Sequence, residues 1–127
     1  MAGPIAKDLT RDMKTKSSFL EYVLRDAMQD IPGITAKAMF GGYGLYKNEV
    51  VFGIIADDEL YFKVDETNRA EYEKRASRPF TYEGKNRKRI TMSYWEVPAG
   101  ILEDRTLLTD WVDASVAASR KTKKTRK

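Results

Sequence analysis

The chain has 127 residues, of which 42% are hydrophobic and 33% charged, and it contains no cysteine and no histidine. This composition excludes disulfides, thiolate or imidazole zinc sites and nucleophile systems with a histidine base, so the fold must rest on a hydrophobic core. The length fits one domain, and no apolar run approaches the roughly 20 residues of a membrane span. We expect a cytoplasmic protein, because the polar N-terminus lacks the apolar stretch of a secretory signal.

The formal charge of +4 is concentrated at the two ends of the chain. The net charge is +2 over residues 1–16, −4 over residues 17–119 and +6 over residues 120–127. We therefore expect a polar arm at 1–16 and a folded domain at 17–119. A segment of Lys, Arg and Thr has nothing to bury, so 120–127 is expected to be a disordered basic tail.

The first predicted element is a helix from about residue 17, since apolar residues recur there at helical spacing until Pro32-Gly33. Runs of β-branched and aromatic residues then predict strands, separated by turns at 47–49 and 57–59. These strands are expected at 38–40, 45–46, 50–55 and 60–64. Connections this short make neighbouring strands antiparallel.

A charged second helix is predicted over 67–77, mostly exposed and ended by Arg78-Pro79. A hairpin of 80–82 and 89–97 follows, around a basic turn, and a third helix begins near Asp104. The order is helix, three or four strands, helix, two strands, helix. It indicates an α+β fold of two layers, with an antiparallel sheet of about five strands and the helices packed on one face.

Several separate blocks of the sequence resemble one family, the TfoX/Sxy N-terminal domain, over about residues 17–119. The residues that carry the resemblance are Met39, Phe40, Gly41, Gly42, Tyr43, Gly44, Pro79, Phe80, Tyr82, Met92, Ser93, Tyr94, Pro98 and Trp111. The resemblance implies the same order of helices and strands. It also implies a relation to regulators of natural competence, which act as transcriptional coactivators alongside the cyclic-AMP receptor protein. Full regulators of this type carry a second, helical domain, and the family supplies no catalytic motif.

Two local patterns could bind a ligand but are better explained by structure. The run from Gly41 to Gly44 fits neither dinucleotide nor P-loop spacing, so its glycines are expected to serve a bulge or a close backbone approach. The run from Asp57 to Glu59 could hold a hard cation, but it stands where a hairpin needs a turn. No carboxylate pair is singled out for acid–base chemistry, and we expect no cofactor and no metal.

Aromatic residues are dense in the predicted strands. Tyr61 and Phe62 are adjacent and must point to opposite faces of the sheet. If helices cover one face, the other would expose aromatic side chains, which commonly mark a protein partner or dimer surface. Stacking of nucleic-acid bases is the alternative role for such a face.

Basic residues at two places could contact phosphates, with an affinity that falls as salt rises. They are Lys85, Arg87, Lys88 and Arg89 at the hairpin turn, and Arg120, Lys121, Lys123, Lys124, Arg126 and Lys127 in the tail. The first hypothesis is a non-enzymatic regulatory or adaptor domain that contacts protein partners, among them transcription machinery, and that could form a homodimer. The second is a direct nucleic-acid binder that uses the basic turn and the tail. An enzyme that uses carboxylates is the third.

Overall fold

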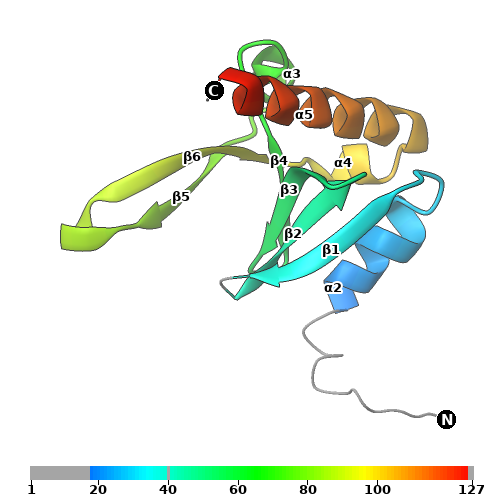
Figure 1. The fold of residues 1–127 in the computed structure, drawn as a ribbon, viewed down its shortest axis with the longest axis horizontal. Coiled ribbons are helices and arrows are strands. Elements are labelled where there is room, and N and C mark those ends of the chain that lie inside the picture. The colour runs from blue at the N-terminus through cyan, green and yellow to red at the C-terminus, as the bar shows by residue number, and fades with distance from the viewer. Residues whose placement is uncertain (1–17, 40, 126–127) are drawn as a thin grey trace, which may run out of the picture.

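A six-stranded antiparallel sheet with strand order β1-β2-β3-β4-β6-β5 forms the frame of the protein (Figure 1). The computed structural model describes residues 18–39 and 41–125, with the side chains of 122–125 left out. The strands are β1 (Ile34–Met39), β2 (Gly42–Lys47), β3 (Val50–Ala56), β4 (Glu59–Lys63), β5 (Pro79–Glu83) and β6 (Arg89–Glu96). The predicted α+β class and antiparallel sheet are confirmed, with six strands where about five were expected.

Helical segments precede, interrupt and follow the strands. They are α2 (Ser18–Glu21), the π-helix η1 (Tyr22–Ala27), α3 (Arg69–Lys74), the 3-10 turn η2 (Lys85–Arg87), α4 (Ala99–Leu102) and α5 (Arg105–Thr125). The three predicted helices are present, although the first widens into a π-helix, where the Met28 N–H donates to the Val23 carbonyl at 2.9 Å. The four-residue α4 was not predicted, because so short an element has no periodicity to read.

The C-terminal helix departs from its predicted end. α5 continues to Thr125, so the expectation of a disordered segment from residue 120 is wrong for 120–125. Lys and Arg are good helix formers, and the helix that precedes them is already nucleated by its packing. Lys121 also bridges to Glu66 at 2.9 Å and to Asp65 at 3.5 Å. The predicted arm at 1–16 and the last two residues lie outside the described part of the chain.

The predicted turns at 47–49 and 57–59 are two-residue hairpin loops. Both central residues of each loop have positive φ, namely Asn48 and Glu49 in one and Asp57 and Asp58 in the other. Positive φ at both positions is what the type I′ hairpin turn requires. The hairpin turn therefore explains the Asp57-Asp58 pair, as the sequence predicts.

The core lies between the sheet and the helices. Its members that are almost fully buried include Val23, Phe52, Phe62, Tyr72, Leu108 and Val112. The β2–β3 register shifts next to Leu45, which leaves Phe52 as an extra residue in β3. Strict alternation would point the Phe52 side chain away from the core, but the bulge turns it inward. Phe52 is fully buried. Among the described residues, no helix is both long and apolar enough to cross a membrane.

Candidate partner-binding face of the sheet

The helices all pack against one face of the sheet. Cross-strand pairing places Gly53 opposite Phe62 and Phe62 opposite Trp95, so these positions share that face. Above them, the Tyr72 ring of α3 lies 4.3 Å from the Trp111 ring of α5 and 6.2 Å from the Trp95 ring. Gly53 makes room for these aromatic rings, because a Cβ there would stand 3.0 Å from the Phe62 ring. This face is closed by the core.

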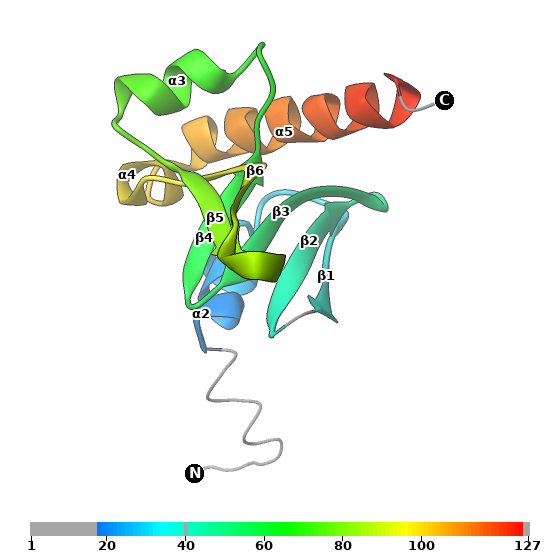
Figure 2. The ribbon, with the colours of Figure 1, turned by 90° about the vertical axis from the view of Figure 1, so that its left-hand side faces the viewer.

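The opposite side of the sheet, which we call the open face, carries no helix of the described chain (Figures 1 and 2). By register, Lys37 and Ile54 lie on either side of Gly44, Val51 lies opposite Tyr46, and Lys63 lies opposite Tyr94. The open face is defined by six residues, Lys37, Tyr46, Val51, Ile54, Lys63 and Tyr94. Lys37 is exposed and the other five are half-buried.

Each tyrosine of the open face has a lysine over its ring. Lys37 Nζ stands 5.2 Å from the Tyr46 ring centre, and Lys63 Nζ stands 5.5 Å from the Tyr94 ring centre. Burial raises the pKa of Tyr94, and the nearby Tyr46 raises it further, so this hydroxyl keeps its proton at neutral pH. The face thus offers apolar surface, hydroxyl donors and two cations.

Gly44 lies beneath two side chains at the centre of the open face. A Cβ at this position would lie 3.0 Å from Cε of Met39 and 3.3 Å from Cε1 of Tyr46, so both side chains cover the glycine. The glycine run was predicted to allow close backbone approach, and Gly42 meets this description. A Cβ on Gly42 would overlap the Ile55 carbonyl oxygen.

An acidic group adjoins the open face where β4 meets β6. Burial raises the pKa of Tyr61, and the carboxylates of Glu59, Glu96 and Asp57 raise it further, whereas Arg78 lowers it. The pKa of Glu59 is also raised, chiefly because its carboxyl shares a hydrogen bond with Glu96, and further by desolvation and repulsion. The carboxylates here outnumber their cation, so the group retains negative charge.

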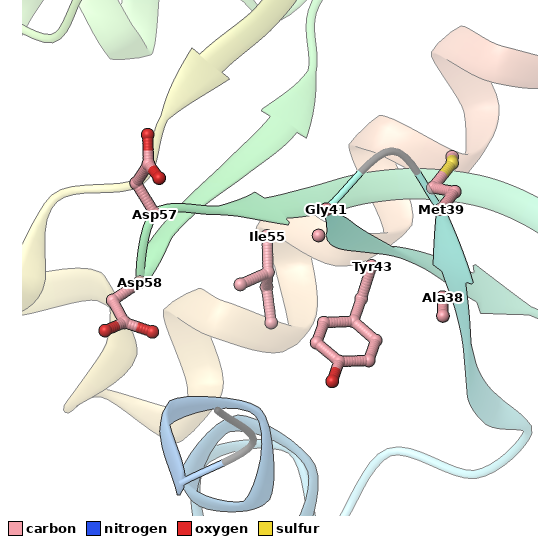
Figure 3. Close-up of a pocket in the computed structure, with 8 residues that line it drawn as sticks. Ala38, Met39, Gly41, Tyr43, Ile55, Asp57 and Asp58 are labelled. Atoms are coloured by element: carbon pink, nitrogen blue, oxygen red, sulfur yellow. The ribbon is translucent and has the colours of Figure 1, made fainter. Parts of the chain in front are cut away.

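A surface pocket of about 490 Å³ lies between the β1–β2 and β3–β4 connections (Figure 3). Its lining includes Met39, Gly41, Gly42 and Tyr43 from the motif, with Ile55 and the two turn aspartates. In Figure 3 the carboxylates of Asp57 and Asp58 point in different directions, away from the Tyr43 ring. No three of the described acidic residues are grouped so as to hold a metal ion.

The remaining motif residues do not converge on this pocket. Pro79, Phe80 and Tyr82 lie on β5, Met92, Ser93 and Tyr94 lie on β6, Pro98 precedes α4 and Trp111 lies in α5. Phe40 is outside the described residues. Most of the motif therefore supports the sheet and core, and only part of it faces solvent.

The two predicted basic clusters lie at separate places. Lys85, Arg87, Lys88 and Arg89 are exposed at the tip of the β5–β6 hairpin, and the basic end of α5 lies beside the segment that leads to α3 (Figures 1 and 2). In Figure 1 the tip of the hairpin and the C-terminal end of α5 lie at separate places. At the end of α5, Lys121 is already paired with acidic groups. Arg126 and Lys127 are outside the described residues, as are the side chains of Lys123 and Lys124.

Sequence reasoning missed two features of these surfaces, namely the lysines over the tyrosine rings and the Glu59–Glu96 carboxyl pair. Each joins residues from different strands. Alternation along one strand assigns a side chain to a face, but it does not say which side chain on the next strand lies opposite. The strand register is set by turns and bulges, which the sequence locates only approximately.

Comparison with curated proteins found no match to this chain. The model of the family described as the TfoX N-terminal domain matches residues 26–119, which include both pocket aspartates, the open face and the β5–β6 hairpin. The match covers most of the chain and agrees with the resemblance noted from the motif blocks. The chain belongs to the TfoX N-terminal domain family.

Proposed function

We propose that this protein is a non-enzymatic regulatory or adaptor domain that binds a protein partner through the open face of its sheet. The observation that carries the proposal is that face itself, where Tyr46, Ile54 and Tyr94 stand on the side without helices, with Lys37 and Lys63 over the rings. Exposed apolar surface rimmed by polar groups is typical of partner sites. The family membership supports a regulatory role.

The partner is proposed to belong to the transcription machinery, and the site of action to be the cytoplasm. Two tyrosines with adjacent lysines suit a partner surface that combines apolar side chains with carboxylates, because tyrosine and cationic groups contribute strongly at interfaces. A competence role is the narrowest form of the proposal, and it rests on the family alone.

The test is affinity capture from cell extract with the full chain as bait, followed by direct binding to the captured protein. The variants are Tyr46→Ser with Lys37→Glu on the open face, and Thr109→Glu on α5 as a control away from it. Binding of RNA polymerase or a transcription factor that weakens about tenfold or more in the open-face variant, and not in the control, supports the proposal. Equal binding by both variants contradicts it.

Nucleic-acid binding is the second candidate, favoured by the exposed basic tip of the β5–β6 hairpin. The test measures the affinity for DNA and RNA over a salt series, for the native chain and for two double variants. One double variant carries Lys123→Gln and Lys124→Gln, and the other carries Lys85→Gln and Lys88→Gln. Neutralisation keeps the helix intact, whereas ending the chain at Ser119 would cut α5. Each lost phosphate contact should lower the salt slope by about one. No binding at low salt by any form excludes this candidate.

A further inference from the structure

The β5–β6 hairpin extends beyond the sheet to which it belongs. β6 pairs with β4 only through Tyr94, Trp95 and Glu96, whereas its residues 89–91 pair with β5. Figure 1 shows this hairpin projecting from the rest of the protein, away from α5. We call β5 together with residues 84–93 the arm. A two-stranded ribbon without a covering layer is only marginally stable in water, so the arm gains from any surface that covers it.

The two sides of the arm differ in character. Tyr82 pairs with Ile90, and by alternation Phe80 and Met92 share their side, which we call the apolar side. The rings of Phe80 and Tyr82 stack at 6.3 Å, and Tyr82 and Ile90 are 47% and 36% exposed. On the other side Thr81 pairs with Thr91 and Glu83 with Arg89, so that side is polar. An apolar side left exposed on a free ribbon is typical of a contact surface.

The ends of the arm carry opposite charge. The tip holds Lys85, Arg87, Lys88 and Arg89 against Glu83, and all five are exposed. The base is the acidic group around Tyr61, where Glu59, Glu96 and Asp57 face one cation, Arg78. Arg89 and Glu96 are seven positions apart along β6, which is about 23 Å of extended chain.

We infer that two copies of the chain form a dimer by packing their arms antiparallel, with the apolar sides face to face and the basic tip of each copy on the acidic base of the other. A single two-fold axis makes both contacts at once, as an isologous interface requires. The second copy fits because the two complementary charges stand at opposite ends of one apolar strip on the same chain. In this dimer the acidic base, where Glu59, Glu96, Asp57 and Arg78 act on Tyr61, gains the cations of the other copy's tip.

This dimer does not depend on the proposed partner binding. Of the open face, Lys37, Tyr46 and Ile54 lie on β1, β2 and β3, toward the edge of the sheet opposite the arm, whereas Lys63 and Tyr94 lie on β4 and β6 beside the arm. Either proposal could fail while the other holds. The variants of the two experiments share no residue of the open face.

The first test measures the mass of the full chain by sedimentation equilibrium over a concentration series, with Ile90→Glu and Thr91→Glu as a matched pair. The two substitutions add the same charge at adjacent positions on opposite sides of the arm. We expect a dimer whose dissociation constant rises roughly thirty-fold with Ile90→Glu, the effect of losing an interface hot spot, and changes little with Thr91→Glu. Thermal unfolding confirms that each variant is folded.

The second test exchanges charges between tip and base. Lys85→Glu with Lys88→Glu makes an acidic tip, and Glu59→Lys with Glu96→Lys makes a basic base; Glu59→Lys alone serves if the double variant does not fold. Each variant by itself should be monomeric at the concentration where the native chain is dimeric. A mixture of the two should form a heterodimer, because every tip then meets a base of opposite sign.

Three results would overturn the inference. The native chain could remain monomeric up to about 1 mM, the range of the weakest specific contacts. A dimer could form that responds equally to Ile90→Glu and Thr91→Glu, which would place the interface elsewhere. The charge-exchanged variants could fail to associate when mixed, which would show that tip and base do not meet.

Discussion

At the scale of single residues, the backbone of a neighbouring strand decides what several positions can hold. Gly42 and Gly44 are both in β2, but they are small for different reasons. Gly42 faces the Ile55 carbonyl, which cannot move without disturbing β3, whereas Gly44 is covered by the flexible Met39 and by the Tyr46 ring. Glu59 and Glu96 are in contact because the register of β4 on β6 brings them together.

Replacement of Gly42 tests the first of these contacts. Gly42→Ala should lower the free energy of unfolding by about 1–3 kcal/mol, the cost of forcing an extra carbon into a packed site. Gly100→Ala is the control, since a Cβ there meets nothing within 4 Å and α4 should gain up to about 1 kcal/mol from the better helix former. Denaturant unfolding measures both. Similar small changes in the two variants would contradict the predicted overlap.

The carboxyl pair predicts a dependence on pH. The pKa of Glu59 is raised from 4.5 in the folded protein, so the folded chain holds this proton more tightly than the unfolded chain. The free energy of unfolding therefore falls as pH rises from about 4.5 through the folded value, and the penalty is complete at neutral pH. Because the side chain is exposed, Glu59→Gln should recover only about 0.2–1 kcal/mol at pH 7 and nothing below pH 4.5.

Dilute protein, in which any dimer is dissociated, is needed for this measurement. Glu103→Gln, an exposed change of the same charge at the end of α4, serves as the control. A gain for Glu59→Gln that persists unchanged below pH 4.5 would show that the Glu59–Glu96 contact is not its source.

At the scale of elements, the helix ends follow local rules with one exception in α3. The Ser77 N–H donates to the Tyr72 carbonyl and the Ala76 N–H donates to the Glu73 carbonyl, both at 3.0 Å, which is the Schellman pattern. Ala76 occupies the position of this motif that glycine usually holds, and its φ is +58°. α5 instead begins in the ordinary way, with the Asp104 carboxylate accepting from the Leu107 N–H at 3.1 Å.

Ala76→Gly should therefore raise the free energy of unfolding by about 1 kcal/mol, because it removes the Cβ penalty of a left-handed residue. Ala70→Gly, an exposed alanine inside the same helix, is the matched control and should lower the free energy of unfolding by about the same amount. The two substitutions are chemically identical, so opposite signs in thermal denaturation would isolate the backbone effect. Equal signs would refute the Schellman assignment.

At the scale of the whole molecule, the sheet has two parts with different support. β2, β3 and β4 lie at its centre, with Phe52, Leu60 and Phe62 buried under α5. The arm has no such layer over it in the described chain, although its own register is regular between Thr81 and Glu83. Cooperative stability should therefore differ between the two parts.

Hydrogen exchange can measure that difference. Amides of the arm, such as those of Tyr82 and Ile90, should exchange at least about a hundredfold faster than those of Phe52 and Phe62, because they open without global unfolding. Their protection should rise with protein concentration if the arms pair. Arm amides protected to the same degree as core amides in dilute monomer would show that the arm is not an independent unit.

The sequence by itself determined the class and order of the elements. Apolar spacing located the helix at the start and that of α5, and the turns were placed at 47–49 and 57–59. Runs of β-branched and aromatic residues located the strands, although β1 begins at Ile34 and not at the expected residue 38. These signals are local, because turn geometry and side-chain period depend on residues close in sequence. Separate motif blocks in the right order were sufficient to recognise the family.

The tertiary structure alone decided which of these residues meet. Phe52 is turned into the core by a bulge, the end of α5 is paired through Lys121 with the segment after β4, and the two basic clusters lie apart. None of this follows from periodicity, because it depends on the register of strands and on contacts between residues more than 30 positions apart. The open face and the arm exist for the same reason. Both are surfaces that the packing of the helices leaves uncovered. Local sequence patterns do not predict which part of a sheet the helices cover, because that depends on tertiary packing.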